Sequence, residues 1–215
     1  MMTLLFYNLG HSQSSLFSED IDSQRKWVES TYAGLSLEEK IGQLFMIDVF
    51  TNKSGKELES IKNFIKDNHI GGVIFSLGTP ARQAKFTNSI QTENKVPLLV
   101  GMDAEWGLAM RLDSTYAFPW NMTLGAIQDT AIVRKVGYQI GEHNQRLGVH
   151  INFAPVADIN TNPDNPIIGN RSFGENKDKV TSHSVALMKG MHDAGILTSA
   201  KHFPGHGDTQ QDSHK

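Results

Sequence analysis

The sequence predicts an α/β fold of the (β/α)8 TIM-barrel type. Short apolar runs alternate with longer stretches of helical spacing, which is typical of consecutive β/α units. The runs are apolar on both faces, as in parallel sheets that helices cover. About five such units fit in the chain, whereas a whole barrel needs eight strands and typically about 250 residues. We therefore expect a barrel that is truncated after about five β/α units.

The apolar runs and helical stretches give definite boundaries. Strands are expected at 44–50, 70–75, 97–102, 149–156 and 195–200. Helices are expected at 21–34, 54–68, 79–95, 129–147 and 175–193. Ser36 and Glu39 form a capping box that starts a further helix running towards Gln43. Ligands of α/β proteins bind beyond the carboxyl ends of the strands, so polar residues there are candidates for a site.

Composition limits the functional classes. The 215 residues are enough for one domain with a substantial core. A formal net charge of −3 and a pI near 6.3 argue against a nucleic-acid or anionic-membrane partner. The chain has no cysteine and hence no disulfide framework, and no run is long enough to span a bilayer. Composition leaves the oligomeric state open.

Residues 1–20 are expected to be a leader or the remnant of a signal peptide. Met1–Leu9 is mostly apolar, and Gly10 and Ser12 put small residues where a signal peptidase would read, although a basic segment is missing. An ordinary flexible leader is the alternative. The pattern favours an exported or periplasmic protein over a cytoplasmic one.

The most polar stretch directly follows the fifth predicted strand, where residues 200–214 read AKHFPGHGDTQQDSH. Asp212 and His214 are two residues apart, so in an extended segment both side chains point to the same side. The carboxylate can fix the imidazole tautomer and raise the imidazole pKa, which suits general acid/base catalysis. Gly205 and Gly207 suggest a pliable loop that swings over a substrate.

Two alternatives to acid/base catalysis stay open for this stretch. Its metal-ligand types allow a divalent-metal site, although their spacing matches no helical histidine pair; they are His202, His206, Asp208, Asp212 and His214. A solvated polar segment without a role is the plainer alternative.

Three other positions also follow predicted strands or lie in the loops after them. Asp103 is the first polar residue after the third strand, where it could also simply cap a turn. Arg171 lies in the long loop after the fourth strand, where a surface arginine would be ordinary. Asp158 is expected to be structural and to order the Arg171 loop. His150 is expected in the core or at its rim, and surface positions are expected for His143, His183 and His192.

The string KHFPGHGDTQQDSH resembles the signature of glycoside hydrolase family 3, specifically its β-N-acetylglucosaminidase branch. The strings DAEWG, followed by Arg111, and NRSFG, which contains Arg171, agree with it in order. The resemblance covers roughly residues 36–214. It implies that 21–215 is the N-terminal part of the family's catalytic barrel.

The resemblance implies an enzyme that removes terminal β-linked N-acetylglucosamine, from peptidoglycan fragments, by a retaining mechanism. His214 would be the acid/base and Asp212 would tune it. The residues that would bind the sugar are Asp103, Arg111, Arg171, Lys201 and His202. The partner is thus a carbohydrate, and neither a metal nor another cofactor is expected.

Two departures from the family pattern are evident. The family's Gly-Gly-Arg after the glutamate is here Trp106-Gly107-Leu108, and Trp106 could stack on a ligand or pack in the barrel wall. The family's nucleophile is an aspartate on a later strand, and no residue of this chain occupies that position. We therefore expect these 215 residues alone to turn over no substrate.

Four alternatives accompany this interpretation. A family 3 β-glucosidase is the first, against which the Asp-Ser-His ending argues. A phosphorylase is the second, because a histidine acid/base would not repel an anionic acceptor. The others are a non-catalytic sugar-binding domain that keeps Asp103, Arg111, Arg171, Lys201 and His202, and a metal-dependent hydrolase.

Overall fold

The computed structural model describes residues 20–212, so nearly all of the expected leader lies outside the described residues. The strands are β1 Met46–Phe50, β2 Gly72–Leu77, β3 Leu99–Met102, β4 Ile151–Asn152 and β5 Leu197–Thr198. The helices are α1 Ile21–Ala33, α2 Leu37–Gly42, α3 Gly55–Asp67, α4 Pro80–Gln91, α5 Asn121–Gly125, α6 Thr130–Arg146 and α7 Lys177–Asp193. Two 3-10 turns, Leu108–Met110 and Gly169–Arg171, lie in the connections.

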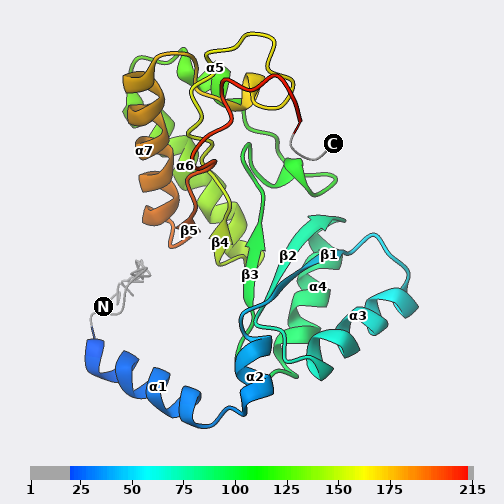
Figure 1. The fold of residues 1–215 in the computed structure, drawn as a ribbon. Coiled ribbons are helices and arrows are strands. Elements are labelled where there is room, and N and C mark those ends of the chain that lie inside the picture. The colour runs from blue at the N-terminus through cyan, green and yellow to red at the C-terminus, as the bar shows by residue number, and fades with distance from the viewer. Residues whose placement is uncertain (1–19, 213–215) are drawn as a thin grey trace, which may run out of the picture.

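The five strands form one parallel sheet in the order β1-β2-β3-β4-β5 (Figure 1). Each strand is therefore added beside its predecessor and on the same side. A barrel is wound in this way, whereas a doubly wound sheet reverses its strand order. Because β/α crossovers are right-handed, this winding places the connecting helices on one face of the sheet. The observed topology is that of consecutive β/α units of a barrel, as predicted.

Local capping explains where the helices begin. Ser36 and Glu39 form the predicted capping box, with the Ser36 N–H donating to Glu39 Oε2 over 2.7 Å. Ser54 and Glu57 form a second one at the start of α3. Each cap satisfies amide groups that the first turn leaves without a partner, and contributes typically about 1 kcal/mol.

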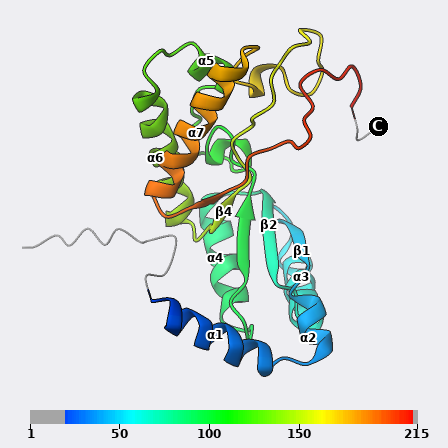
Figure 2. The ribbon, with the colours of Figure 1, turned by 60° about the vertical axis from the view of Figure 1, so that its left-hand side comes forward.

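The core has two clusters of buried apolar side chains. The first lies between β1–β3 and the helices α3 and α4, and includes Val73, Phe75 and Val100. The second joins α5, α6 and α7 and includes Leu187 and Met191. Figures 1 and 2 both show α6 and α7 side by side along β4 and β5. Together the two clusters pack the helices against the sheet, and the loops after the strands lie at its carboxyl end.

Two expectations about the second half of the chain need correction. The strands β4 and β5 are shorter than predicted, and Leu197 is 37% exposed rather than buried. Pro155 has no N–H to continue the ladder, which resumes at the bridge between Val156 and Lys201. His183, expected at the surface, is only 3% exposed, because α7 packs its ring against Phe173 near α5.

The first helix has a different character from the others. None of the residues of α1 is buried, and Trp27 and Tyr32 on it are exposed. Lys40 of α2 places its ammonium 3.8 Å from the centre of the Tyr32 ring. Within the described residues, no helix combines the length and apolarity that crossing a membrane requires.

Candidate active site

The candidate site lies beyond the carboxyl ends of β3, β4 and β5, where loops from distant parts of the sequence meet. Asp103 directly follows β3. Lys201 follows β5 and places its Nζ 2.8 Å from Asp103 Oδ1. Because Ala157 N–H donates to the Lys201 carbonyl oxygen over 2.6 Å, the extended backbone after β4 fixes the position of this lysine.

Asp103 is a carboxylate held between two cations. Arg111 donates from Nη2 to Oδ2 over 2.7 Å, while Lys201 binds the other oxygen. Burial favours a higher pKa for Asp103, but the hydrogen bond and charge of Lys201, followed by those of Arg111, outweigh it and lower the pKa below its ordinary value. Asp103 is therefore an ionised acceptor with both oxygens oriented.

Glu105 is a central residue of the site that the sequence reasoning did not single out. It is 2% exposed, and its carboxylate accepts two hydrogen bonds from Arg171, from Nε over 3.0 Å and from Nη2 over 2.8 Å. Lys201 Nζ lies 2.7 Å from Glu105 Oε1. Burial again favours a higher pKa for Glu105, but Arg171 and Lys201 lower it overall. The alternation Asp103-Ala104-Glu105 after a strand is the signal that could have indicated it.

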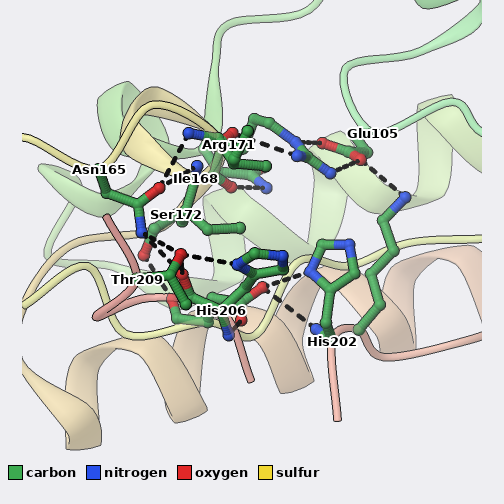
Figure 3. Close-up of polar contacts among 12 residues, drawn as sticks. Glu105, Asn165, Ile168, Arg171, Ser172, His202, His206 and Thr209 are labelled. Carbon is green, nitrogen blue, oxygen red and sulfur yellow. Dashed lines mark hydrogen bonds and ion pairs between the residues drawn. The ribbon is translucent and has the colours of Figure 1, made fainter. Parts of the chain in front are cut away.

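These contacts join the predicted sugar-binding residues into one network. Lys201 contacts both carboxylates, Arg111 contacts Asp103, and Arg171 contacts Glu105. The pKa of Arg171 is raised, chiefly by its hydrogen bond to Glu105. The site thus presents fixed charges of both signs, as Figure 3 shows for Glu105 and Arg171.

Asp158 holds His202 at the same carboxyl edge of the sheet. Its Nδ1 lies 2.7 Å from Asp158 Oδ2, and its backbone N–H donates to the same oxygen over 3.1 Å. The backbone carbonyl oxygen of Asp158 accepts a hydrogen bond from Ser172 Oγ over 2.6 Å, so the backbone at this position contacts the end of the Arg171 loop, whereas an ordering role for the carboxylate stays a prediction. All five residues predicted to bind sugar therefore lie in adjoining contacts at this edge of the sheet.

The loop after His202 is bound to the loop that follows β4 (Figure 3). His206 N–H donates to Asp158 Oδ1 over 2.5 Å, and Asn165 Nδ2 donates to the His206 carbonyl oxygen over 2.7 Å. A Cβ on Gly207 would lie 1.8 Å from the carbonyl oxygen of Ile159. At this position glycine permits close contact between the two loops, rather than the pliability that the sequence suggested.

Comparison with known proteins identifies the family. Residues 36–215 match the family model described as "Glycosyl hydrolase family 3 N terminal domain". The chain belongs to glycoside hydrolase family 3. The resemblance seen in the sequence is thereby confirmed.

Individual relatives agree with this family. Beta-hexosaminidase A of Pseudoalteromonas piscicida is 38% identical over 167 residues, which cover 72% of this chain and 28% of that protein. The structure of a family 3 β-N-acetylglucosaminidase from Paenibacillus sp. str. FPU-7 is 38% identical with a TM-score of 0.76, and the match covers 84% of this chain and 35% of that one.

A further solved structure is similar over nearly all of this chain. A β-glucoside phosphorylase, BglX, bound to 2FGlc, matches with a TM-score of 0.84 at 27% identity, over 94% of this chain and 35% of that one. These neighbours confirm the fold class predicted from the sequence. The chain spans about a third of the length of each of these relatives.

The sequence also led to expectations for Trp106 and for the Asp212–His214 pair of this family 3 chain. Trp106 contacts Trp120, with ring centres 4.1 Å apart and planes at 39°, and Trp120 is itself 42% exposed, so both expected roles of Trp106 stay predictions. Asp212 is the last described residue, and His214 lies outside the described residues. The Asp212–His214 pair therefore stays a prediction.

A cavity of about 490 Å³ borders the His202 side of this family 3 site, and its lining includes Asp158, Ile159, Thr161, His202, Pro204 and Asp208. Over the stretch 20–212, no group of three or more metal-ligating side chains is arranged to hold a metal ion. The charged side chains of the site are oriented hydrogen-bond acceptors and donors, which suit a ligand rich in hydroxyl groups.

Proposed function

We propose that this chain carries the sugar-binding residues and the acid/base of a retaining β-N-acetylhexosaminidase. Its substrate would be a terminal β-linked N-acetylglucosamine, in peptidoglycan fragments. The observation that supports this most directly is Asp103, an ionised carboxylate whose two oxygens are oriented by Lys201 and Arg111. Family membership and the β-hexosaminidase relatives support the reaction class.

The charges suit recognition of a sugar. A carboxylate can accept hydrogen bonds from two neighbouring hydroxyl groups, and Asp103 keeps part of its surface accessible. Lys201 and Arg171 carry donors for hydroxyl or carbonyl oxygens, and the planar fork of Arg171 is held by Glu105. The order imposed by these ion pairs lowers the entropy that the side chains would otherwise lose when a sugar binds.

The proposed mechanism assigns the proton transfers to His214. It donates a proton to the glycosidic oxygen while a carboxylate nucleophile attacks the anomeric carbon, so that a glycosyl-enzyme forms as the aglycone leaves. His214 then removes a proton from the water that hydrolyses this intermediate. Asp212 stabilises the imidazolium state. The nucleophile is the aspartate that the family pattern places on a later strand.

Binding of N-acetylglucosamine to the 215-residue chain, measured by calorimetry, tests the sugar-binding half of the proposal. Asp103→Asn should weaken binding about tenfold or more, because a charged acceptor is lost. Asp164→Asn is the matched control, since Asp164 is an exposed aspartate of the loop after β4. Equal affinities of both variants and wild type, or no binding by the wild type, would contradict the proposal.

Turnover is measured separately on a chromogenic N-acetylglucosaminide. Hydrolysis by this chain that is lost in His214→Ala would support the acid/base assignment and overturn the expectation that the chain alone is inactive. Sugar binding without turnover is the result expected for this length of chain. If a longer chain that supplies the later strands also binds without turnover, the alternative of a non-catalytic sugar-binding domain is favoured.

A phosphorylase is the second candidate, and the likeness to a β-glucoside phosphorylase favours it. A histidine acid/base carries no negative charge, so it would not repel phosphate as an acceptor. Release of a sugar 1-phosphate that depends on added phosphate would favour this candidate, whereas release of free N-acetylglucosamine at the same rate without phosphate would exclude it.

A further inference from the structure

The buried carboxylate of Asp158 accepts hydrogen bonds at both of its oxygens. Oδ1 accepts from the His206 backbone N–H over 2.5 Å, and Oδ2 accepts from the His202 backbone N–H over 3.1 Å. The third contact is His202 Nδ1, 2.7 Å from Oδ2. The Asp158 side chain has no exposed surface. These three contacts therefore satisfy a carboxylate that is shielded from bulk solvent.

The chemistry of these donors decides which nitrogen of His202 carries the proton. The two backbone N–H groups can only donate, so both carboxylate oxygens act as acceptors. A proton on Oδ2 would oppose the His202 N–H that already points at it. The short contact between Nδ1 and Oδ2 is therefore a hydrogen bond donated by Nδ1–H.

The other ring nitrogen is left for a ligand. His202 Nε2 makes no hydrogen bond with any residue of the described part of the chain, and the side chain is 34% exposed. Figure 3 shows the His202 ring beside His206 and below the Glu105–Arg171 pair. The cavity beyond the strand ends is lined by both His202 and Asp158. In the neutral ring with hydrogen on Nδ1, Nε2 is an acceptor.

We propose that Asp158 is a positioning residue that fixes His202 in the Nδ1–H tautomer, so that Nε2 accepts a hydrogen bond from a sugar hydroxyl. The inference deepens the proposed function and rests on it for the identity of the ligand. It assigns His202 an accepting role beside Lys201, which can only donate.

The same carboxylate links this ring to the loop that follows. Through His206 N–H it fixes the backbone four residues beyond His202, and Asn165 Nδ2 holds the His206 carbonyl oxygen over 2.7 Å. A carboxylate that merely held this loop would have no effect on the tautomer of His202. The tautomer is thus the property that separates positioning from a structural role alone.

Nuclear magnetic resonance of the 215-residue chain with ¹⁵N-labelled histidine tests the tautomer without a ligand. Long-range ¹H–¹⁵N correlations distinguish a protonated ring nitrogen from an accepting one, and His202→Gln assigns the signals of His202. We expect a protonated Nδ1 and an accepting Nε2 in the wild type. A wild-type His202 with its proton on Nε2 would overturn the proposal, whatever any variant does.

Asp158→Ala is the informative variant because it removes both acceptor oxygens. Asn would be ambiguous, since its amide oxygen at the Oδ2 position could still accept from Nδ1–H. Without an acceptor beside Nδ1, His202 should shift towards the Nε2–H tautomer that a free imidazole prefers. Asp164→Ala, in the exposed part of the same loop, should leave the spectrum of His202 unchanged. A folded Asp158→Ala chain that keeps the wild-type tautomer would also contradict the proposal.

Binding of N-acetylglucosamine provides the second readout. Asp158→Ala should weaken it roughly tenfold relative to Asp164→Ala, because an Nε2 that carries the proton can no longer accept from the hydroxyl. If the wild type binds no N-acetylglucosamine but shows the expected tautomer, the proposed function fails and the positioning role stands. If it binds with the opposite tautomer, the positioning role fails and the proposed function stands.

Discussion

At the scale of single residues, the site depends on carboxylates that are each shared by several partners. Lys201 Nζ lies within 2.8 Å of both Asp103 and Glu105, so one ammonium group separates two negative charges. Glu105 in turn orients the guanidinium of Arg171. Removing one charge weakens the compensation of its partners in a partly buried environment, which is costly.

Glu105→Gln tests this arrangement. The amide keeps the size of the side chain but removes the charge that compensates Arg171 and Lys201, both of which are mostly buried. Loss of one member of a fully buried pair costs about 3–5 kcal/mol, and the partial exposure of the cations reduces this to roughly 1–3 kcal/mol. The free energy of unfolding in urea measures the effect.

Glu142→Gln is the control for that experiment. Glu142, which is half-buried, lies 4.0 Å from the exposed Arg146 in an i,i+4 pair on α6, and helix pairs of this kind contribute only about 0.3–0.5 kcal/mol. Glu105→Gln and Glu142→Gln should therefore differ clearly. Equal losses of stability would show that Glu105 contributes no more than a surface charge.

At the scale of elements, the sequence predicted the helices well because their signals are local. Caps such as Ser36 and Asp129 and the helical spacing of apolar residues lie within each segment. The strand order also followed, since each β/α unit adds its strand beside the previous one. The lengths of β4 and β5 could not be predicted from the sequence, because the hydrogen-bond ladder between two strands depends on the register of two separate segments.

The candidate site was predictable only in part, for the same reason. Asp103 and Lys201 could be placed because each directly follows a predicted strand. The role of Glu105 depends on Arg171 and Lys201, which lie far from it in the sequence. The burial of His183 likewise depends on how α7 lies against its neighbours.

The contact between α6 and α7 requires small residues, and Gly190→Ala tests this. A Cβ at Gly190 would lie 2.0 Å from the carbonyl oxygen of Arg134, so the two helix backbones would have to separate. Alanine favours a helix by about 1 kcal/mol over glycine, but overpacking costs typically about 1–3 kcal/mol. We therefore expect a net loss of stability and a lower melting temperature by circular dichroism.

Gly55→Ala is the matched substitution. Gly55 is the first residue of α3, and a Cβ there would have no neighbour within 4 Å. This variant should be as stable as the wild type or slightly more stable. If Gly190→Ala behaved in the same way, close packing of the helix backbones would not be what glycine provides.

At the scale of the whole molecule, the lowered pKa values of Asp103 and Glu105 predict acid sensitivity. Groups whose pKa is lower in the folded state stabilise it above their ordinary values, 3.8 for aspartate and 4.5 for glutamate. The contribution begins to decline as the pH falls to those values and is lost as it falls through the lowered ones. The free energy of unfolding, measured from neutral pH downwards, should show this decline.

The double variant Asp103→Asn, Glu105→Gln isolates the contribution of the site from that of other carboxyl groups. Its stability should be lower than that of the wild type at neutral pH, and the difference should shrink in acid, where both wild-type groups become protonated. Parallel stability curves for the two chains would show that neither carboxyl group is the origin of the acid sensitivity.

The ion pair between Lys201 and Asp103 closes a span of 98 residues. The side chains proposed to bind a sugar consequently lie close together only in the folded chain. In an unfolded chain they would be far apart and could not bind the same sugar together. Binding and folding are then linked equilibria, and saturation at about a hundred times Kd would add about 2.7 kcal/mol to stability. A rise in melting temperature on titration with sugar would thus reveal a ligand even for a chain that catalyses nothing.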